Sequence, residues 1–187
     1  MRITHALLLA VSARLTGALD VSDLFRAEVV MTLSALDHYV HEAARAGMLD
    51  VFRGGRPSTA AYLNFPVSMR NSVISMNGAS AEARLEQEIR NRHSFLSFQH
   101  PDKIADAVRL YSNVELWNAV GPAMGATATD VKKRLALLVD RRNKIAHEAD
   151  RDPTYDGARW PIDDALVTAT IDFISALAEA IDVAAGI

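Results

Sequence analysis

One short segment of the sequence carries three side chains whose types and spacing favour chemistry at a phosphate group. They are Arg142, Asn143 and His147. On a helix, at about 100° per residue, Asn143 and His147 share one face because they are four positions apart, and Arg142 adjoins them. A guanidinium binds phosphate oxygens through two parallel hydrogen bonds, and an imidazole exchanges protons near neutral pH. The segment could therefore bind a phosphodiester and move protons at it.

Arg142 occupies a position where a cation is unusual. The apolar residues of the segment 131–148 gather on one side of a helical wheel, and Arg142 lies in the middle of that side. They are Val131, Leu135, Leu138, Ile145 and Ala146. A cation there is unfavourable unless it is paired, faces an interface or binds an anion. One alternative is an ion pair with Glu28 or Asp37, with His147 only stabilising the helix end.

The charge pattern restricts the kind of nucleic-acid contact. The chain has 20 basic and 23 acidic residues and a formal net charge of −3, which argues against a protein that coats duplex DNA through its overall field. The segment around Arg142 is nevertheless locally basic. Its other basic residues are Lys132, Lys133, Arg134, Arg141 and Lys144.

The elements that must position this segment follow a helical period. Apolar residues recur at three-to-four spacing over 22–46, which predicts a long helix with Ser22 as its N-cap and Gly47 at its end. A shorter packing helix is expected over 3–15. The run Gly54-Gly55-Arg56-Pro57 predicts a break in the chain.

The rest of the chain also predicts helices. Two helices with a clear apolar period are predicted at the C-terminal end. The first runs from about Thr129-Asp130 to His147, and the second begins at Asp163-Asp164, with a polar loop over 150–161 between them. Shorter helices are expected over 58–63, 66–76, 80–98, 101–110 and 114–120, with Gly121-Pro122 stopping the last. No run of alternating β-branched residues requires a sheet. We therefore predict an all-α fold, a single-domain antiparallel helical bundle with extra short helices, spanning 1–187. Its core is about 22–185, and 1–20 form an N-terminal packing helix.

Several classes of protein and site are disfavoured. The absence of cysteine excludes disulfides and thiolate nucleophiles and fits a reducing cytoplasm, so we expect a cytoplasmic protein without membrane contact. The apolar stretch 6–11 after Met1-Arg2 resembles a signal peptide, but it is short and Arg14 follows it, so we do not expect secretion. No stretch approaches the about 20 apolar residues needed to span a bilayer. His38 and His41 are too few for a metal site, and we expect neither metal nor cofactor. We interpret Arg90-x2-His93 as part of a charged helix face. We expect Trp160 to anchor its loop to the core; the alternative is that it stacks on an RNA base.

The octapeptide 141–148, Arg-Arg-Asn-Lys-Ile-Ala-His-Glu, resembles the Arg-polar-x3-His signature of the HEPN superfamily. Segments 26–41, 97–110, 150–153 and 159–163 resemble the RiboL-PSP type of HEPN domain, and the similarity covers about 24–180. The resemblance implies a bundle of four to five helices that dimerises so that two motif helices meet in a cleft. It also implies that Arg142 and His147 are the catalytic pair and Asn143 the supporting residue.

Catalytic members of this superfamily are metal-independent endoribonucleases, common in toxin–antitoxin, abortive-infection and RNA-processing systems. RNA carries its own nucleophile, the 2′-OH, so we expect cleavage to a 2′,3′-cyclic phosphate and a 5′-OH, with the second histidine coming from a partner subunit. Arg141, Lys144, Lys133 and Arg159 are expected to contact single-stranded RNA or tRNA. An antitoxin or another defence-system protein is an expected partner. The alternative is a non-catalytic dimeric HEPN module that binds RNA or a partner protein.

Overall fold

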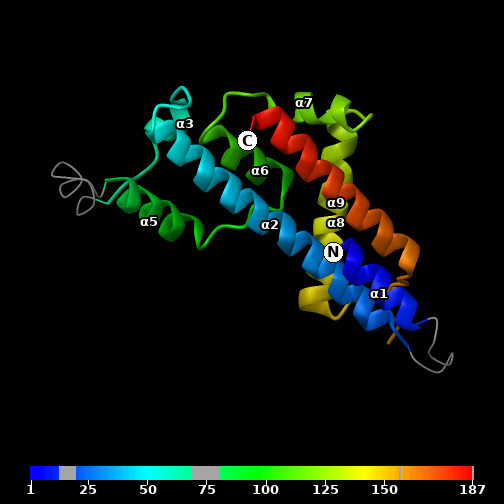
Figure 1. Ribbon diagram of the computed structural model, residues 1–187. Coiled ribbons are helices and arrows are strands. Elements are labelled where there is room, and N and C mark those ends of the chain that lie inside the picture. The colour runs from blue at the N-terminus through cyan, green and yellow to red at the C-terminus, as the bar shows by residue number, and fades with distance from the viewer. Residues whose placement is uncertain (13–19, 69–80, 156, 187) are drawn as a thin grey trace.

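The computed structural model describes residues 1–12, 20–68, 81–155 and 157–186, and within these ranges the chain is helical, with one isolated β-bridge between Arg151 and Arg159 (Figure 1). The helices are α1 (Arg2–Ser12), α2 (Ser22–Phe52), α3 (Ala60–Leu63), α5 (Ala81–His93), α6 (Pro101–Arg109), α7 (Leu116–Ala123), α8 (Ala128–Glu148) and α9 (Asp164–Ala185). The all-α prediction is confirmed. None of the described helices is long and apolar enough to cross a membrane.

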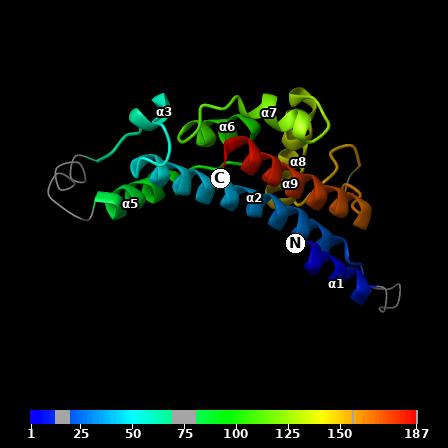
Figure 2. The same cartoon turned by 45° about the horizontal axis from the view of Figure 1, so that its top comes forward.

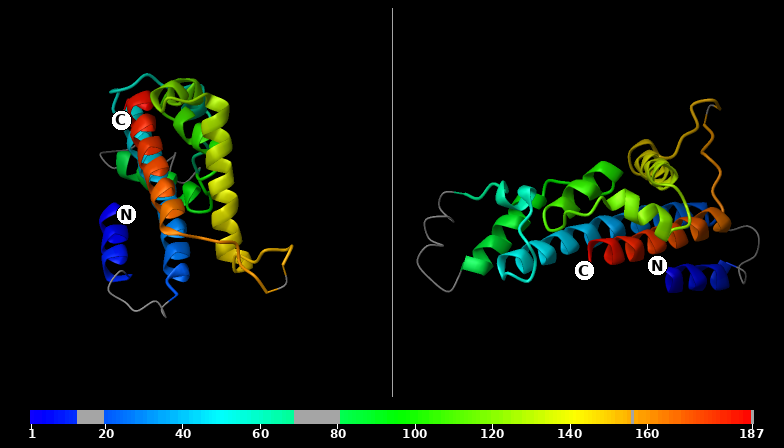
Figure 3. Two further views of the ribbon diagram at one scale, coloured as in Figure 1. Left: turned by 90° about the vertical axis from the view of Figure 1, so that its right-hand side faces the viewer. Right: turned by 90° about the horizontal axis from the view of Figure 1, so that it is seen from above.

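The long helix α2 is the spine of the molecule. Helices α8 and α9 run beside it, α3 and α5 lie at its C-terminal end, and α1 lies near its N-terminal end (Figures 2 and 3). Leu33 of α2, Leu135 of α8 and Leu177 of α9 are each fully buried in one shared core. Burying such a side chain contributes about 1.5–3 kcal/mol, so this core fixes the position of α8.

Gly47 does not end the long helix, and that prediction is wrong. Helix α2 continues through Gly47 to Phe52 and stops before Gly54, whose φ is +80°. A Cβ atom on Gly47 would lie 2.3 Å from Cγ of Tyr111, so the glycine permits close packing there. A glycine selected for packing carries the same sequence signal as one selected for a helix end.

The ends of the later helices fall close to their predicted places, and their caps explain why. The hydroxyl of Thr127 accepts from the amide of Asp130 at 3.1 Å, and the carboxylate of Asp163 accepts from the amide of Leu166 at 2.8 Å. These N-caps begin α8 and α9. Helix α7 runs through Gly121-Pro122 and ends at Ala123, slightly beyond the predicted stop.

The middle of the chain deviates more from the predicted pattern. The expected helix 58–63 is reduced to α3, and 80–98 ends at His93. Of the expected helix 66–76, residues 66–68 are not helical and the remainder lies outside the described residues. The end of the expected helix 3–15 also lies outside them.

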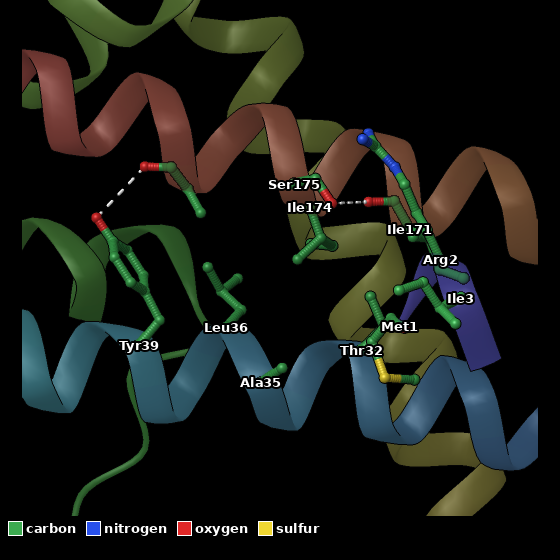
Figure 4. Close-up of a pocket in the computed structure, with 11 residues that line it drawn as sticks. Met1, Arg2, Ile3, Thr32, Ala35, Leu36, Tyr39, Ile171, Ile174 and Ser175 are labelled. Atoms are coloured by element: carbon green, nitrogen blue, oxygen red, sulfur yellow. Dashed lines mark hydrogen bonds between the residues drawn. The ribbon is translucent and has the colours of Figure 1, made fainter. Parts of the chain in front are cut away.

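Helix α1 is attached to the bundle by a buried polar contact. Nδ1 of His5 lies 2.7 Å from Oε2 of Glu28 on α2, and its Nε2 lies 3.0 Å from Oγ1 of Thr168 on α9. His5 and Glu28 are both buried. Beside this contact an apolar groove of about 460 Å³ extends between α2 and α9, with Arg2 toward one end and Tyr39 toward the other (Figure 4).

Candidate active site

The C-terminal half of α8 is the part of the motif helix that reaches the surface. Val131 and Leu135 in the first half are buried, whereas Leu138 and Ile145 further along are only partly buried. Ala146 is exposed, although the helical wheel assigned it to the apolar side. The apolar side of α8 is thus covered by the bundle at its beginning and open near its end.

Arg142, Asn143 and His147 lie on this open half. Nη1 of Arg142 donates a hydrogen bond to Oδ1 of Asn143 at 3.0 Å. The Arg142 side chain is half-buried, and its Nε is shielded from solvent without a hydrogen-bond partner among the described residues. His147 is exposed one turn beyond Asn143 and has no hydrogen bond to either residue within the described ranges. The structure therefore brings the guanidinium and the amide together and leaves the imidazole accessible next to them.

Arg142 is not paired with the carboxylates that the sequence offered as an alternative. Glu28 binds His5, and the Asp37 carboxylate accepts from the amide of Phe98. Within the described parts of the chain, no carboxylate lies within ion-pair distance of Arg142. A half-buried guanidinium without a counter-ion is suited to bind an anion.

The preceding arginine, Arg141, has the opposite environment. Its Nη2 lies 2.9 Å from Oδ2 of Asp150, and Nε of Arg26 lies 2.8 Å from the same oxygen. Both arginines also donate to the carbonyl of Trp160. Arg26 is 5% exposed and Asp150 is 0% exposed. Burial lowers the pKa of Arg141, and the Asp150 charge opposes that shift.

The backbone after α8 takes an uncommon path to bring Asp150 inside. Ala149 and Asp150 have φ values of 52° and 57°, in the left-handed region, and such residues cost about 1–3 kcal/mol each. The amide of Asp150 donates to the carbonyl of Lys144 at 3.0 Å, and the amide of Trp160 donates to the carbonyl of Asp150 at 2.9 Å. The two arginines offset this strain because they hold the carboxylate in place.

Sequence reasoning missed Arg26 and Asp150 as parts of this region. A signal for Arg26 existed, because it lies three and seven positions before Val29 and Leu33 on the apolar side of α2. The argument applied to Arg142 would have singled it out as well. Asp150 had no such signal, since a loop aspartate is ordinarily solvated.

The residues expected to contact RNA have different surroundings. Lys133 is exposed, and Lys144 forms an ion pair with Asp140 at 2.8 Å, which raises the pKa of Lys144. Arg141 and Arg159 hold internal partners, the latter Asp23 and the carbonyl of Ala149.

The loop over 150–161 is closed on itself near the end of the motif helix. The Arg151–Arg159 bridge joins its two arms, and Trp160 is half-buried at its base, with a shielded Nε1 that has no hydrogen-bond partner among the described residues. This position agrees with the predicted anchor role of Trp160. Tyr155, near the tip, is 70% exposed.

A second group of titratable side chains lies at the other end of α2. His38, His41 and His93 line a cavity of about 360 Å³ between α2 and α5. Arg90 pairs with Glu86 and is part of a charged face as predicted, but His93 is buried rather than on that face. Over the described ranges, no three histidine or acidic side chains are arranged to hold a metal ion.

Comparison with protein-family models gives a match to RiboL-PSP-HEPN over residues 10–185. The chain belongs to the RiboL-PSP-HEPN family. The match contains α2 to α9, and with them the HEPN motif on α8 and the loop that holds Asp150. The predicted resemblance is confirmed. Comparison with curated proteins and with solved structures found no match.

Membership of the HEPN family links the chain to RNA. The family is one of ribonuclease-like or RNA-related proteins, and HEPN domains often bind RNA and dimerise. The site on α8 is therefore best considered with RNA as its ligand.

Proposed function

We propose that this HEPN protein is a metal-independent endoribonuclease that works as a homodimer. It cleaves RNA by attack of the 2′-OH on the adjacent phosphorus and leaves a 2′,3′-cyclic phosphate and a 5′-OH. The observation that carries the proposal is the half-buried Arg142 guanidinium, which lacks a carboxylate partner and lies beside Asn143 on the helix that carries the exposed His147.

The chemistry follows from what each side chain can do. His147 of one subunit accepts the proton of the 2′-OH, and the freed oxygen forms a bond to phosphorus. The bond from phosphorus to the 5′-oxygen then breaks, and His147 of the partner subunit gives that oxygen a proton. Arg142 stabilises the negative charge that grows on the phosphoryl oxygens, and Asn143 holds the guanidinium in place.

A dimer supplies what one copy lacks. A single imidazole cannot act as base and acid in the same step, whereas a two-fold axis sets identical residues opposite one another. The open half of α8 is a suitable contact face, because Leu138 and Ile145 on its apolar side are only partly buried and Ala146 is exposed.

The basic residues around the site extend it toward the RNA backbone. Lys133 and Lys144 can bind flanking phosphates, since both lie at the surface of α8. Arg159 would share its guanidinium group between a phosphate and its internal partners, whereas Arg141 is held by the buried Asp150. Single-stranded RNA or tRNA is the proposed substrate, because only an unpaired strand bends freely enough for in-line attack by its 2′-OH.

Incubation of the purified protein with tRNA and single-stranded RNA in excess EDTA tests the proposal. We expect the wild-type protein to cleave RNA in EDTA. His147→Ala should reduce the cleavage rate by at least about a thousandfold. His38→Ala, which changes another exposed histidine of the chain, should leave the rate unchanged. A substrate with one 2′-deoxynucleotide should resist cleavage at that position only.

Two results would contradict the proposal. Loss of cleavage in EDTA would contradict the absence of a metal, and full activity of His147→Ala would exclude the assigned residue. RNA binding without cleavage by the wild-type protein would instead favour the non-catalytic HEPN module.

The biological setting that fits such an activity is growth arrest, in a toxin–antitoxin or phage-defence system with an antitoxin or another restraining partner. Expression of the wild-type chain should then stop cell growth, and expression of His147→Ala should not.

A further inference from the structure

The carboxylate of Asp150 is the most deeply buried charged group in the described part of the chain. It is 0% exposed, and its Oδ2 accepts from Arg26 at 2.8 Å and from Arg141 at 2.9 Å. These two partners come from α2 and α8. The carboxylate therefore joins the motif helix to the spine of the bundle, three residues after His147.

The position of His147 depends on how α8 ends. His147 lies in the last turn of α8, which ends at Glu148, and the carbonyl groups of a last turn have no further turn to bind them. The amides of Ala149 and Asp150 both donate to the carbonyl of Lys144 and so close the end of the helix. The buried side chain of Asp150 then prevents this closing residue from moving away.

We propose that Asp150 is a positioning residue for His147, and that Arg141 contributes to cleavage by holding Asp150 rather than by binding RNA. The inference rests on the ribonuclease function proposed above. It predicts that loss of the Asp150 charge loosens the last turn of α8 while the first half of the helix, held by Val131 and Leu135 in the core, remains in place.

The matched pair of variants is Asp150→Asn and Asp23→Asn. Asparagine keeps the size of the side chain and removes its charge. Asp23 also faces Arg26, at 3.6 Å, but its side chain is 71% exposed, so its loss tests the effect of charge near Arg26 without burial. Both variants are studied as the full chain.

Amide hydrogen exchange and steady-state cleavage are the two measurements. In Asp150→Asn we expect exchange at residues 147–150 to accelerate by about tenfold or more beyond any acceleration over 131–139. We expect kcat to fall by about a hundredfold with KM within about twofold, because a displaced catalytic group affects the reaction step and not the binding of RNA. Asp23→Asn should match the wild type in exchange and in kcat, because its other partner, Arg159, is placed at the RNA backbone and would affect KM alone.

Unchanged kcat and unchanged exchange in Asp150→Asn would overturn the inference. A uniform acceleration of exchange over α2, α8 and α9 would overturn it too, because Asp150 would then support the whole fold and not the last turn. If the wild-type protein cleaves no RNA, the proposed function fails, and the exchange pattern still decides whether Asp150 fixes the turn that carries His147.

Arg141→Gln provides a second test in case Asp150→Asn does not fold, because it leaves Arg26 on the carboxylate. We expect kcat to fall, KM to stay constant and exchange to accelerate in the same last turn. A higher KM with unchanged kcat would show that Arg141 binds RNA and would overturn its assignment.

Discussion

Two adjacent arginines on α8 show how far the partner of a side chain distinguishes residues of the same type. Arg141 is fixed by a buried carboxylate, whereas Arg142 contacts only the side-chain amide of Asn143 and has no counter-ion within the described ranges. Both are half-buried. The difference lies in which partner each side chain reaches, and it predicts opposite effects of the same substitution.

Replacement of either arginine by methionine tests this difference. We expect Arg141→Met to lower the free energy of unfolding by about 2–4 kcal/mol, because it leaves part of a buried charge network unpaired. Arg142→Met should change it by less than about 1 kcal/mol, since no ion pair is lost, yet it should abolish RNA cleavage. Urea titration followed by circular dichroism measures the first quantity. An equal loss of stability in both variants would contradict the distinction.

At the residue scale, the sequence pointed to the residues of the candidate site but not to the buried ion pair beside them. Arg142, Asn143 and His147 were found because helical spacing alone determines which residues share a face. The ion pair of Arg141 was not predicted, because its partner Asp150 lies nine residues away in a loop and becomes buried only through two left-handed residues that have no glycine signal.

At the scale of elements, helix starts were predictable and some helix ends were not. The caps Thr127 and Asp163 are local signals, so α8 and α9 begin within a residue or two of the predicted positions. Gly47, in contrast, lies inside α2, where it permits close packing with Tyr111 far away in the sequence, and the helix continues to Phe52. Tertiary packing therefore overrode the local signal.

The junction of α2 and α5 contains a histidine whose protonation is coupled to folding. His93 is 4% exposed, and burial, with His41 nearby, lowers its pKa to about 4. The unfolded chain has a histidine pKa of about 6.5. Between these values the unfolded state binds more protons than the folded state, so the stability contributed by neutral His93 is complete above about pH 6.5 and is lost as the pH falls toward 4.

We therefore expect the free energy of unfolding to fall by up to about 3 kcal/mol between pH 6.5 and pH 4 through His93, at about 1.4 kcal/mol per unit of pKa shift. His93→Gln should flatten this part of the pH profile, and His38→Gln, at an exposed histidine of the same cavity, should not. Denaturant titrations at a series of pH values provide the measurement. An unchanged slope in His93→Gln would show that other groups cause the pH dependence.

At the scale of the whole molecule, the bundle buries part of the first half of α8 and leaves the end of this helix accessible at the surface. The N-terminal half of α8 lies in the core with α2 and α7, and its C-terminal half carries the motif at the surface beside the loop 150–161 (Figure 3). A monomer in this arrangement holds half of the chemistry that the proposed mechanism needs. The dimer is thus a requirement of the mechanism, and it can be tested through activity.

Mixed dimers distinguish a composite site that needs His147 of both subunits from a site that works within each subunit alone. If both histidines are needed, equal amounts of wild type and His147→Ala, allowed to exchange subunits, should retain about one quarter of the activity of the same total amount of wild type, because random pairing leaves that share of fully wild-type dimers. If each subunit works alone, about one half should remain.

Differently tagged subunits allow the mixed dimer to be purified and assayed directly, and a mixture with His38→Ala controls for the exchange procedure. Cleavage by the purified mixed dimer at half the wild-type rate would mean that a single His147 serves as both base and acid, and the composite site would have to be abandoned.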